Sequence, residues 1–276
     1  AKNECVITSR TPRQIPHFVS VSEALECEAL VFALAAQQTA QWLDQNFTYK
    51  NQKILVASKG IDAASGRFLN EIFESHVARG NLAYLSGPSF ATEVMQKLPC
   101  ALVVSSCNEN LAELFASTFP AYIKTYTSGD IIGAEVCGAY KNVIAIASGV
   151  CDGLGLGNNA RASLIARGIV EIARFGKFFG ARDETFLGLS GVGDLFLTAS
   201  SALSRNYRVG LGLARGKGLE EILRELGEVA EGVATTEAVV NIATKYKIYA
   251  PIATEVAQIL RGNDVRASLK DLLRKK

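Results

Sequence analysis

The sequence predicts an α/β fold, in which a Rossmann-like, mostly parallel sheet is followed by an all-α domain. Up to about residue 127, short β-rich runs alternate with amphipathic stretches of helical period, which is the pattern of a parallel sheet covered by helices. After Ser128 and Gly129 the β-rich runs stop and long helical patterns follow. The length of 276 residues also suits two hydrophobic cores better than one. We therefore expect one domain over 1–127 and a second over 128–276.

The strands of the first domain are short runs rich in β-branched and aromatic residues, separated by helical patterns. The expected strands span 4–8, 29–34, 53–57, 82–86, 101–105 and 122–126. The expected helices between them span 22–26, 37–45, 67–77, 90–96 and 110–117. Open sheets of this kind bind ligands at the carboxyl ends of their strands, so polar residues directly after the strands are candidates for a site.

The second domain should be built from long helices. They are expected at 131–152, 160–179, 206–215, 235–247, 251–260 and 264–273. Gly180, Gly216 and Gly262 follow apolar-periodic segments and suit helix ends, and Pro251 suits a first helical turn.

The composition argues against several classes of protein. The net charge is +2 and no block of like charges stands out, so we expect no nucleic-acid partner. The strongly apolar runs fall short of the roughly 18 to 20 residues that cross a bilayer, and the opening residues carry no secretory signal, so we expect neither a membrane span nor export. Six cysteines at irregular spacings, with only two histidines, predict reduced thiols in the cytoplasm and no metal site.

The motif that opens a dinucleotide-binding domain is missing from the sequence. Such domains begin with a strand, a G-x-G-x-x-G turn and a helix, whose backbone N–H groups hold the pyrophosphate. This chain opens on what reads as the second strand, at 4–8, so we expect a first βα unit of roughly 20 residues to precede it in the natural protein. Glycine patterns at 153–157 and 191–194 lack a preceding strand and are not this motif.

Ser9 and Arg10 follow the expected strand at 4–8. At this position an acidic residue would bind the adenosine ribose of NAD, whereas an arginine could meet the 2′-phosphate of NADP. No acidic residue stands there, which favours NADP or the use of both dinucleotides. An arginine at a strand end is equally an ordinary surface residue.

Three loops carry candidate ligand-binding residues. Lys59 follows one expected strand, although a lysine after a strand is by default a surface charge. Gly87 permits close approach of the backbone after another strand, and Ser89 opens a helix whose N-terminal amides could donate to a phosphate or an amide. Glu231 precedes a helix and by itself indicates only a helix start. Ser89 could likewise be only the N-cap of its helix.

The segment EVCGAYKNVIAIASGV at 135–150 is the most informative, because a lysine and an asparagine interrupt a helix that is otherwise apolar on nearly every face. Removal from water and nearby cations both disfavour an ammonium ion. The pKa of Lys141 could therefore fall far enough for the amine to accept a hydroxyl proton at neutral pH. A lysine whose amine reaches water along its stem fits this segment equally well.

Two further segments carry polar residues near helix starts. Asp194 and Thr198 are four residues apart, hence on one helical face, and could address a substrate hydroxyl. An aspartate early in a helix also simply favours the helix dipole. Ser204, Arg205 and Asn206 combine a cap, a fork-shaped cation and an amide, which suits phosphate oxygens but is also a common helix start.

Taken together, these segments resemble the bacterial type of NAD(P)-dependent glycerol-3-phosphate dehydrogenase. The resemblance covers about 53–259, and the lysine–asparagine helix with the Gly-Asp-Leu and Ser-Arg-Asn segments is specific to that family as a set. The matching segments, in chain order, are SKGID, SGPSFA, GAYKNVIAIASG, GVGDLFLT, SRNYRVG and AEGVATT.

The resemblance implies a homodimeric cytoplasmic enzyme that interconverts sn-glycerol 3-phosphate and dihydroxyacetone phosphate with NAD or NADP, and that supplies glycerol 3-phosphate for phospholipid synthesis. The domain over 1–127 would bind the dinucleotide, and the domain over 128–276 would bind substrate and catalyse. Lys141 would accept the proton, while Asp194 and Lys59 hold the hydroxyl and orient the base. The expected substrate site comprises Lys59, Gly87, Ser89, Lys141, Asp194, Thr198, Ser204, Arg205 and Asn206. The expected cofactor contacts are Ser9, Arg10, Lys59, Ala91, Arg205, Val229 and Glu231.

Two alternatives stay open at this point. A related two-domain dehydrogenase of the 6-phosphogluconate or hydroxyacid type also carries a lysine on the first helix of its helical domain, and it would act on a different substrate. A non-catalytic module that senses a sugar phosphate would explain a lost glycine loop. Retention of Lys141, Asp194 and Glu231 favours an enzyme.

Overall fold

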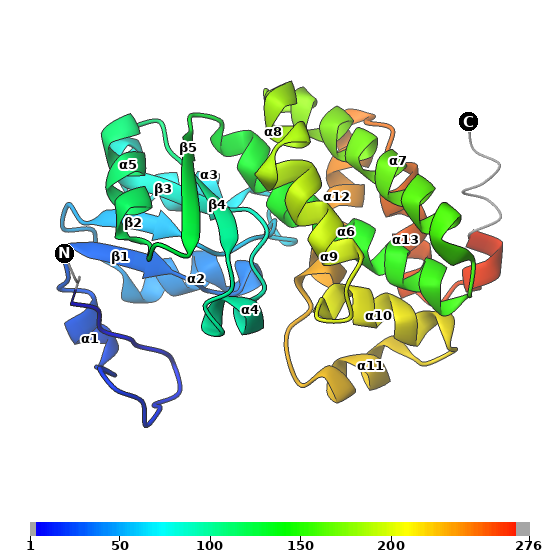
Figure 1. Cartoon of the computed structure of the whole chain (residues 1–276), viewed down its shortest axis with the longest axis horizontal. Helices are drawn as coiled ribbons and strands as arrows, with labels where there is room; N and C mark the ends of the chain where they lie inside the picture. Colours follow the sequence, from blue (N-terminus) through cyan, green and yellow to red (C-terminus); the bar gives the residue numbers. More distant parts are fainter. Residues whose placement is uncertain (1–3, 269–276) are drawn as a thin grey trace.

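The computed structural model describes residues 4–268 as a sheet domain followed by a helical domain (Figure 1). The sheet has five strands in the order β1-β2-β3-β4-β5. Three of the four strand pairings are parallel, and only the pairing of β3 with β4 is antiparallel. This confirms the Rossmann-like, mostly parallel class. The strands are β1 (Ala29–Phe32), β2 (Lys53–Val56), β3 (Leu82–Ser86), β4 (Cys100–Ser105) and β5 (Ile123–Ser128).

Helices pack on both faces of this sheet. On one face, α2 (Ala36–Asn46) and α3 (Leu69–Glu74) bury Leu43 and Phe73 against β1 and β2, and on the other face α5 (Glu109–Thr118) buries Phe115. Strand β2 is consequently buried on both sides, which explains its uninterrupted apolar sequence. The helices of this domain are α1 (Val21–Ala24), α2 (Ala36–Asn46), α3 (Leu69–Glu74), α4 (Ala91–Met95) and α5 (Glu109–Thr118), with a short 3₁₀ turn at Arg79–Asn81.

The expected strand at 4–8 is wrong. This segment joins no strand of the sheet and makes a single isolated bridge, between Ile7 and Phe18. Figure 1 shows it beside α1, apart from the sheet. β-rich side chains are not sufficient for a strand, because the backbone also needs a partner, and this segment does not reach the open edge of β1, where Val31 is 64% exposed.

The helical domain is assembled around one long central helix, α6 (Ile131–Gly153). Asp130 begins it: one carboxylate oxygen accepts the Gly133 N–H at 2.9 Å, and the other accepts from Thr185 at 2.6 Å. The remaining elements are α7 (Gly157–Phe178), α8 (Asp183–Leu187), a π turn (Leu189–Gly193), α9 (Asp194–Ala199), α10 (Arg205–Ala214), α11 (Leu219–Leu226), α12 (Glu231–Tyr246) and α13 (Pro251–Leu260).

Helix α6 is buried along almost its whole length. The helix has 23 residues, and an 18-residue window within it has a mean hydropathy of 1.2. By length and composition alone it could therefore cross a membrane, although we expected no membrane span from the sequence. That window is 94% buried inside the protein, as expected for a core helix. Glycines allow α10 to pack closely on it, since a Cβ at Gly149 or Gly210 would stand 2.0 Å from a backbone oxygen of the other helix.

Several short elements differ from the expected helices. Helices α8, α9 and α11 were not among those expected, because α8 and α9 are only five and six residues long and are separated by a glycine-rich π turn. Helix α11 lies between Gly218 and Gly227, and Gly227 ends it with a φ of +64°. The expected helix at 264–273 lies partly outside the described residues.

Candidate active site

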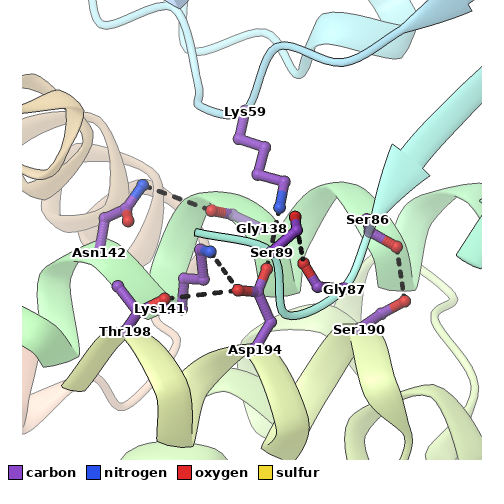
Figure 2. A network of polar contacts seen from close by, with 10 residues as sticks. All are labelled: Lys59, Ser86, Gly87, Ser89, Gly138, Lys141, Asn142, Ser190, Asp194 and Thr198. Carbon is purple, nitrogen blue, oxygen red and sulfur yellow. Dashed lines mark hydrogen bonds and ion pairs between the residues drawn. The ribbon is translucent and has the colours of Figure 1, made fainter. Parts of the chain in front are cut away.

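Two lysines share one buried carboxylate where the domains meet (Figure 2). The Lys141 Nζ donates a 2.5 Å hydrogen bond to Asp194 Oδ1, and the Lys59 Nζ donates a 2.9 Å hydrogen bond to Oδ2. Lys141 lies on α6, Asp194 begins α9, and Lys59 lies in the loop after β2. The side chain of Asp194 is 3% exposed and that of Lys141 is 10% exposed. The site therefore holds two positive charges against one negative charge, largely away from water.

The elements around this group explain why the three side chains meet. Gly138 lies one turn before Lys141 on α6, and a Cβ there would stand 3.3 Å from Cγ and Cδ of Lys59. The absence of that Cβ gives the Lys59 stem a path along the helix toward Asp194. On the opposite side, the π turn ends directly at Asp194 and sets the direction from which α9 approaches α6.

The environment disfavours the charged form of Lys141. The pKa of Lys141 is lowered to about 8: burial is the largest cause, the attraction of Asp194 opposes it, and the neighbouring Lys59 adds to the lowering. Burial also tends to raise the pKa of Asp194, but the attraction of the two lysines outweighs it, so the pKa of Asp194 lies below its usual value. The aspartate therefore stays ionised while Lys141 can exchange a proton near neutral pH.

Thr198 lies one turn after Asp194 on α9, and its Oγ1 donates a 3.4 Å hydrogen bond to Asp194 Oδ1. The loop after β3 approaches the same place from the sheet domain. Gly87 has a φ of +110° there, and a Cβ would stand 3.0 Å from the carbonyl oxygen of Ala101. Ser89 is exposed, and its hydroxyl donates to the Gly87 carbonyl at 3.3 Å. Glycine is thus required for the turn that brings this loop to the site.

The Ser-Arg-Asn turn is connected to α6 through a glycine. Ser204 begins α10 by accepting the Tyr207 N–H at 3.3 Å. Asn206 Oδ1 accepts the Gly232 N–H at 2.9 Å, and a Cβ at Gly232 would stand 2.8 Å from the Asn142 carbonyl oxygen. Arg205 is exposed and forms a 3.2 Å ion pair with Glu228. Its guanidinium can therefore turn to an anionic ligand without breaking a buried contact.

Glu231 connects the helical domain to the sheet domain. Its Oε1 accepts the Ala36 N–H at 3.2 Å, at the N-terminus of α2, while its Oε2 is buried without a hydrogen-bond partner. Burial raises the pKa of Glu231, and the Ala36 amide and Arg205 oppose this. A Cβ at Gly60 would stand 3.6 Å from Oε2. An unpartnered carboxylate oxygen beside the Lys59 loop fits a ligand that brings a donor, such as the amide or a ribose hydroxyl of a nicotinamide nucleotide.

The other expected cofactor contacts lie on the surface. Ala91 begins α4 and is exposed, and Val229 is exposed in the loop before α12. Arg10 is exposed and Ser9 partly so, in the segment that does not join the sheet. The structure thus places Glu231 beside the loop that carries Lys59, and the other expected cofactor contacts lie apart from them on the surface.

Glu135 is a buried carboxyl that the sequence reasoning missed. It lies six residues before Lys141 on α6, and its Oε2 accepts the Asn70 N–H at 3.1 Å. Burial raises the pKa of Glu135 to about 8, while the amides of Asn70 and Leu69 and the charge of Lys59 oppose this shift. The sequence could have indicated Glu135, because an acidic residue in this apolar segment is as unusual as Lys141.

A mostly parallel α/β domain whose strand ends meet a buried lysine–aspartate pair on a helical domain defines a two-domain, nicotinamide-dependent dehydrogenase. The particular family follows from comparison with known proteins. Residues 3–112 match the family model for the N-terminus of NAD-dependent glycerol-3-phosphate dehydrogenase, and residues 130–270 match the model for its C-terminus. This chain belongs to that family, as the sequence predicted.

Relatives and solved structures agree with this assignment. A glycerol-3-phosphate dehydrogenase (NAD(P)+) of Sulfurimonas denitrificans is 62% identical over 99% of this chain and 92% of the relative. One from Campylobacter lari is 61% identical, over all of this chain and 92% of the relative. The crystal structure of glycerol-3-phosphate dehydrogenase from Coxiella burnetii superposes with a TM-score of 0.89 at 32% identity, covering 95% of this chain and 82% of that one.

Proposed function

We propose that this chain interconverts sn-glycerol 3-phosphate and dihydroxyacetone phosphate with NAD or NADP, using Lys141 as the general base and acid. The family membership supports the reaction, and the buried Lys141–Asp194–Lys59 group supports the assignment of the proton-transfer residue. A general base works best when its pKa lies near the pH of the reaction, and the pKa of Lys141 is about 8. Its side chain is also largely shielded from water.

In the oxidation direction, neutral Lys141 Nζ accepts the proton of the C2 hydroxyl, and the C2 carbon loses a hydride. A nicotinamide nucleotide, held by the residues proposed below, would supply the hydride acceptor in this direction and the hydride donor in the reverse direction. In the reduction direction, protonated Lys141 donates its proton to the oxygen of the C2 carbonyl. Asp194 stays ionised, orients the amine, and stabilises the ammonium form that each oxidation leaves behind.

Lys59 has a positioning and electrostatic role in this proposal. Its ammonium lies on the other oxygen of Asp194, so it disfavours a second positive charge on Lys141 and can donate to the substrate oxygen. Thr198 holds Asp194 from the next turn. Gly87 and Ser89 would contact the substrate from the sheet domain.

The phosphate would be bound by Ser204, Arg205 and Asn206. Arg205 offers a charge-assisted, fork-shaped contact, and Ser204 and the first amides of α10 add donors at a helix N-terminus. The glycerol part of the substrate would then lie between this turn and Lys141. Asn206 supports this placement, because it is hydrogen-bonded to Gly232, which packs against the backbone next to Lys141.

Cofactor contacts are proposed for Lys59, Ala91, Arg205, Val229 and Glu231, together with Ser9 and Arg10 near the adenosine end. The unpartnered Glu231 Oε2 supports this placement at the nicotinamide end. The domain over 1–127 would bind the dinucleotide and the domain over 128–276 would bind substrate. In the cell the product glycerol 3-phosphate would supply phospholipid synthesis.

We further propose a homodimer in the cytoplasm. Phe178 on α7 and Tyr246 on α12 are exposed with ring centroids 5.1 Å apart, and Tyr249 continues this aromatic surface next to Arg174. Exposed aromatic groups of this kind are common where subunits associate. All six cysteines are free, which suits a reducing compartment. Sedimentation equilibrium would test the dimer, and a monomer at micromolar concentration would contradict it.

The reaction is tested by oxidation of NADH and NADPH with dihydroxyacetone phosphate, using the purified protein. Turnover with this substrate and none with hydroxycarboxylates is expected. Activity only with a hydroxycarboxylate would overturn the substrate, and binding of sugar phosphates without turnover would indicate a sensor module. Comparing the two nucleotides in the same assay gives the cofactor preference.

A further inference from the structure

A buried pair of hydroxyl groups joins the two domains close to the catalytic group (Figure 2). The side-chain oxygens of Ser86 and Ser190 are 2.6 Å apart and share a hydrogen bond. Ser86 is 2% exposed and Ser190 is 3% exposed. Neither hydroxyl can therefore exchange its partner for bulk water without a movement of the domains.

Each of these serines lies at the base of a segment that carries substrate-site residues. Ser86 is the last residue of β3 and directly precedes Gly87, where the loop to Ser89 begins. Ser190 lies in the π turn, four residues before Asp194. The pair thus connects the loop from one domain with the carboxylate from the other, although it is not part of the proposed proton transfer.

We infer that the Ser86–Ser190 hydrogen bond is a positioning contact that fixes the substrate loop of the sheet domain relative to Asp194 of the helical domain. The inference rests on the proposed function, because it concerns the alignment of that same site. A buried hydroxyl without a partner is unfavourable, so a relative position of the domains that separates the two oxygens is disfavoured. Glycines beside each serine leave the backbone more conformational freedom than other residues would, so the hydroxyl contact adds a restraint there.

The π turn makes this restraint necessary. A π turn is a rare local departure from the α-helix that is frequent at functional sites. Gly191 and Gly193 lie within the five residues of this turn, so its direction depends on contacts with neighbours. Since Asp194 begins at the end of the turn, a shift at Ser190 would move the carboxylate that holds both lysines.

The test is a set of four variants: Ser86→Ala, Ser190→Ala, the double variant, and Ser106→Ala as a matched control. Ser106 is 3% exposed, and its hydroxyl donates to the Leu82 carbonyl at 2.7 Å, entirely within the sheet domain. We expect kcat for dihydroxyacetone phosphate reduction to fall roughly 10- to 100-fold in both single variants, because small misplacements of reacting groups cost rates of this order. The control Ser106→Ala should lower the unfolding temperature about as much as the two single variants do, but it should leave kcat unchanged.

The double variant separates this bond from unrelated effects. One shared hydrogen bond predicts that the double variant loses no more kcat, and no more stability against denaturant, than either single variant. Additive losses, or wild-type kcat in Ser190→Ala, would overturn the inference. If the wild-type protein does not turn over dihydroxyacetone phosphate, the proposed function fails, while the denaturant measurements still decide whether the serines are coupled.

Discussion

The helical domain and the sheet domain contribute to the site in different ways. In the helical domain, Lys141 and Asp194 stand on packed helices, and both side chains are at most 10% exposed. In the sheet domain, Lys59 and Ser89 stand on loops after strands, and Lys59 is 24% exposed. The positions of Lys141 and Asp194 are therefore set by core packing, whereas the ligand contacts proposed for the sheet domain depend on loops. Variants in the two regions should fail in different ways.

Lys141→Ala should have the largest effect on activity. Loss of a general base typically lowers kcat by 10²- to 10⁴-fold. Folding should change little, because Asp194 keeps its ion pair with Lys59 and one buried ammonium is removed. Steady-state kinetics and the thermal unfolding midpoint measure both effects. Lys177→Ala, at an exposed ion pair with Asp183, is the control, and wild-type kcat in Lys141→Ala would remove Lys141 from the mechanism.

Asp194→Asn should damage both stability and catalysis. The substitution leaves two lysines without their shared counter-charge, which should cost about 3 kcal/mol, at the lower end for a broken buried pair because Lys59 is partly exposed. Asp194 raises the pKa of Lys141, so its removal should move the pH dependence of glycerol 3-phosphate oxidation to lower pH. Denaturant unfolding and a pH–rate profile measure the two effects. An unchanged profile would show that the carboxylate does not control the amine.

Arg205→Ala should mainly raise the KM for substrate, roughly 10-fold or more, as expected for loss of a charge-assisted hydrogen bond. Arg205 is exposed, so stability should stay within about 0.5 kcal/mol of the wild type. Arg208→Ala is a matched control, since it lies exposed on the same helix. Equal KM values for the two variants would place the phosphate elsewhere.

Glu135→Gln should change stability in a pH-dependent way. The folded pKa of Glu135 is about 8, above an unfolded value of 4.5, so the folded state binds the extra proton between these values. This contribution is fully present below pH 4.5 and is lost as the pH rises through 8, with a slope of at most about 1.4 kcal/mol per pH unit. The glutamine variant should remove that slope in denaturant unfolding measured from pH 5 to about 8. A slope equal to that of the wild type would contradict the assignment.

The sequence predicted more about the helical part of the site than about the sheet. Lys141 could be singled out because a charged residue interrupts an apolar helix, and Glu135 carried the same signal without being used. The strand predicted at 4–8 was wrong, because its side chains favour a strand but no strand of the sheet pairs with it. Nothing local marks Ser86 and Ser190, since buried serines are unremarkable in sequence and their partnership depends on how two domains meet.

The most direct test of the account is the pH dependence of kcat in both directions, measured with the purified protein. Oxidation of glycerol 3-phosphate requires neutral Lys141, so its rate should rise with pH and level off above an apparent pKa near 8. Reduction of dihydroxyacetone phosphate requires the protonated amine and should fall over the same range. Both dependences should disappear in the residual activity of Lys141→Ala. Profiles that are identical in the wild type and this variant would contradict the central claim that the buried amine moves the proton.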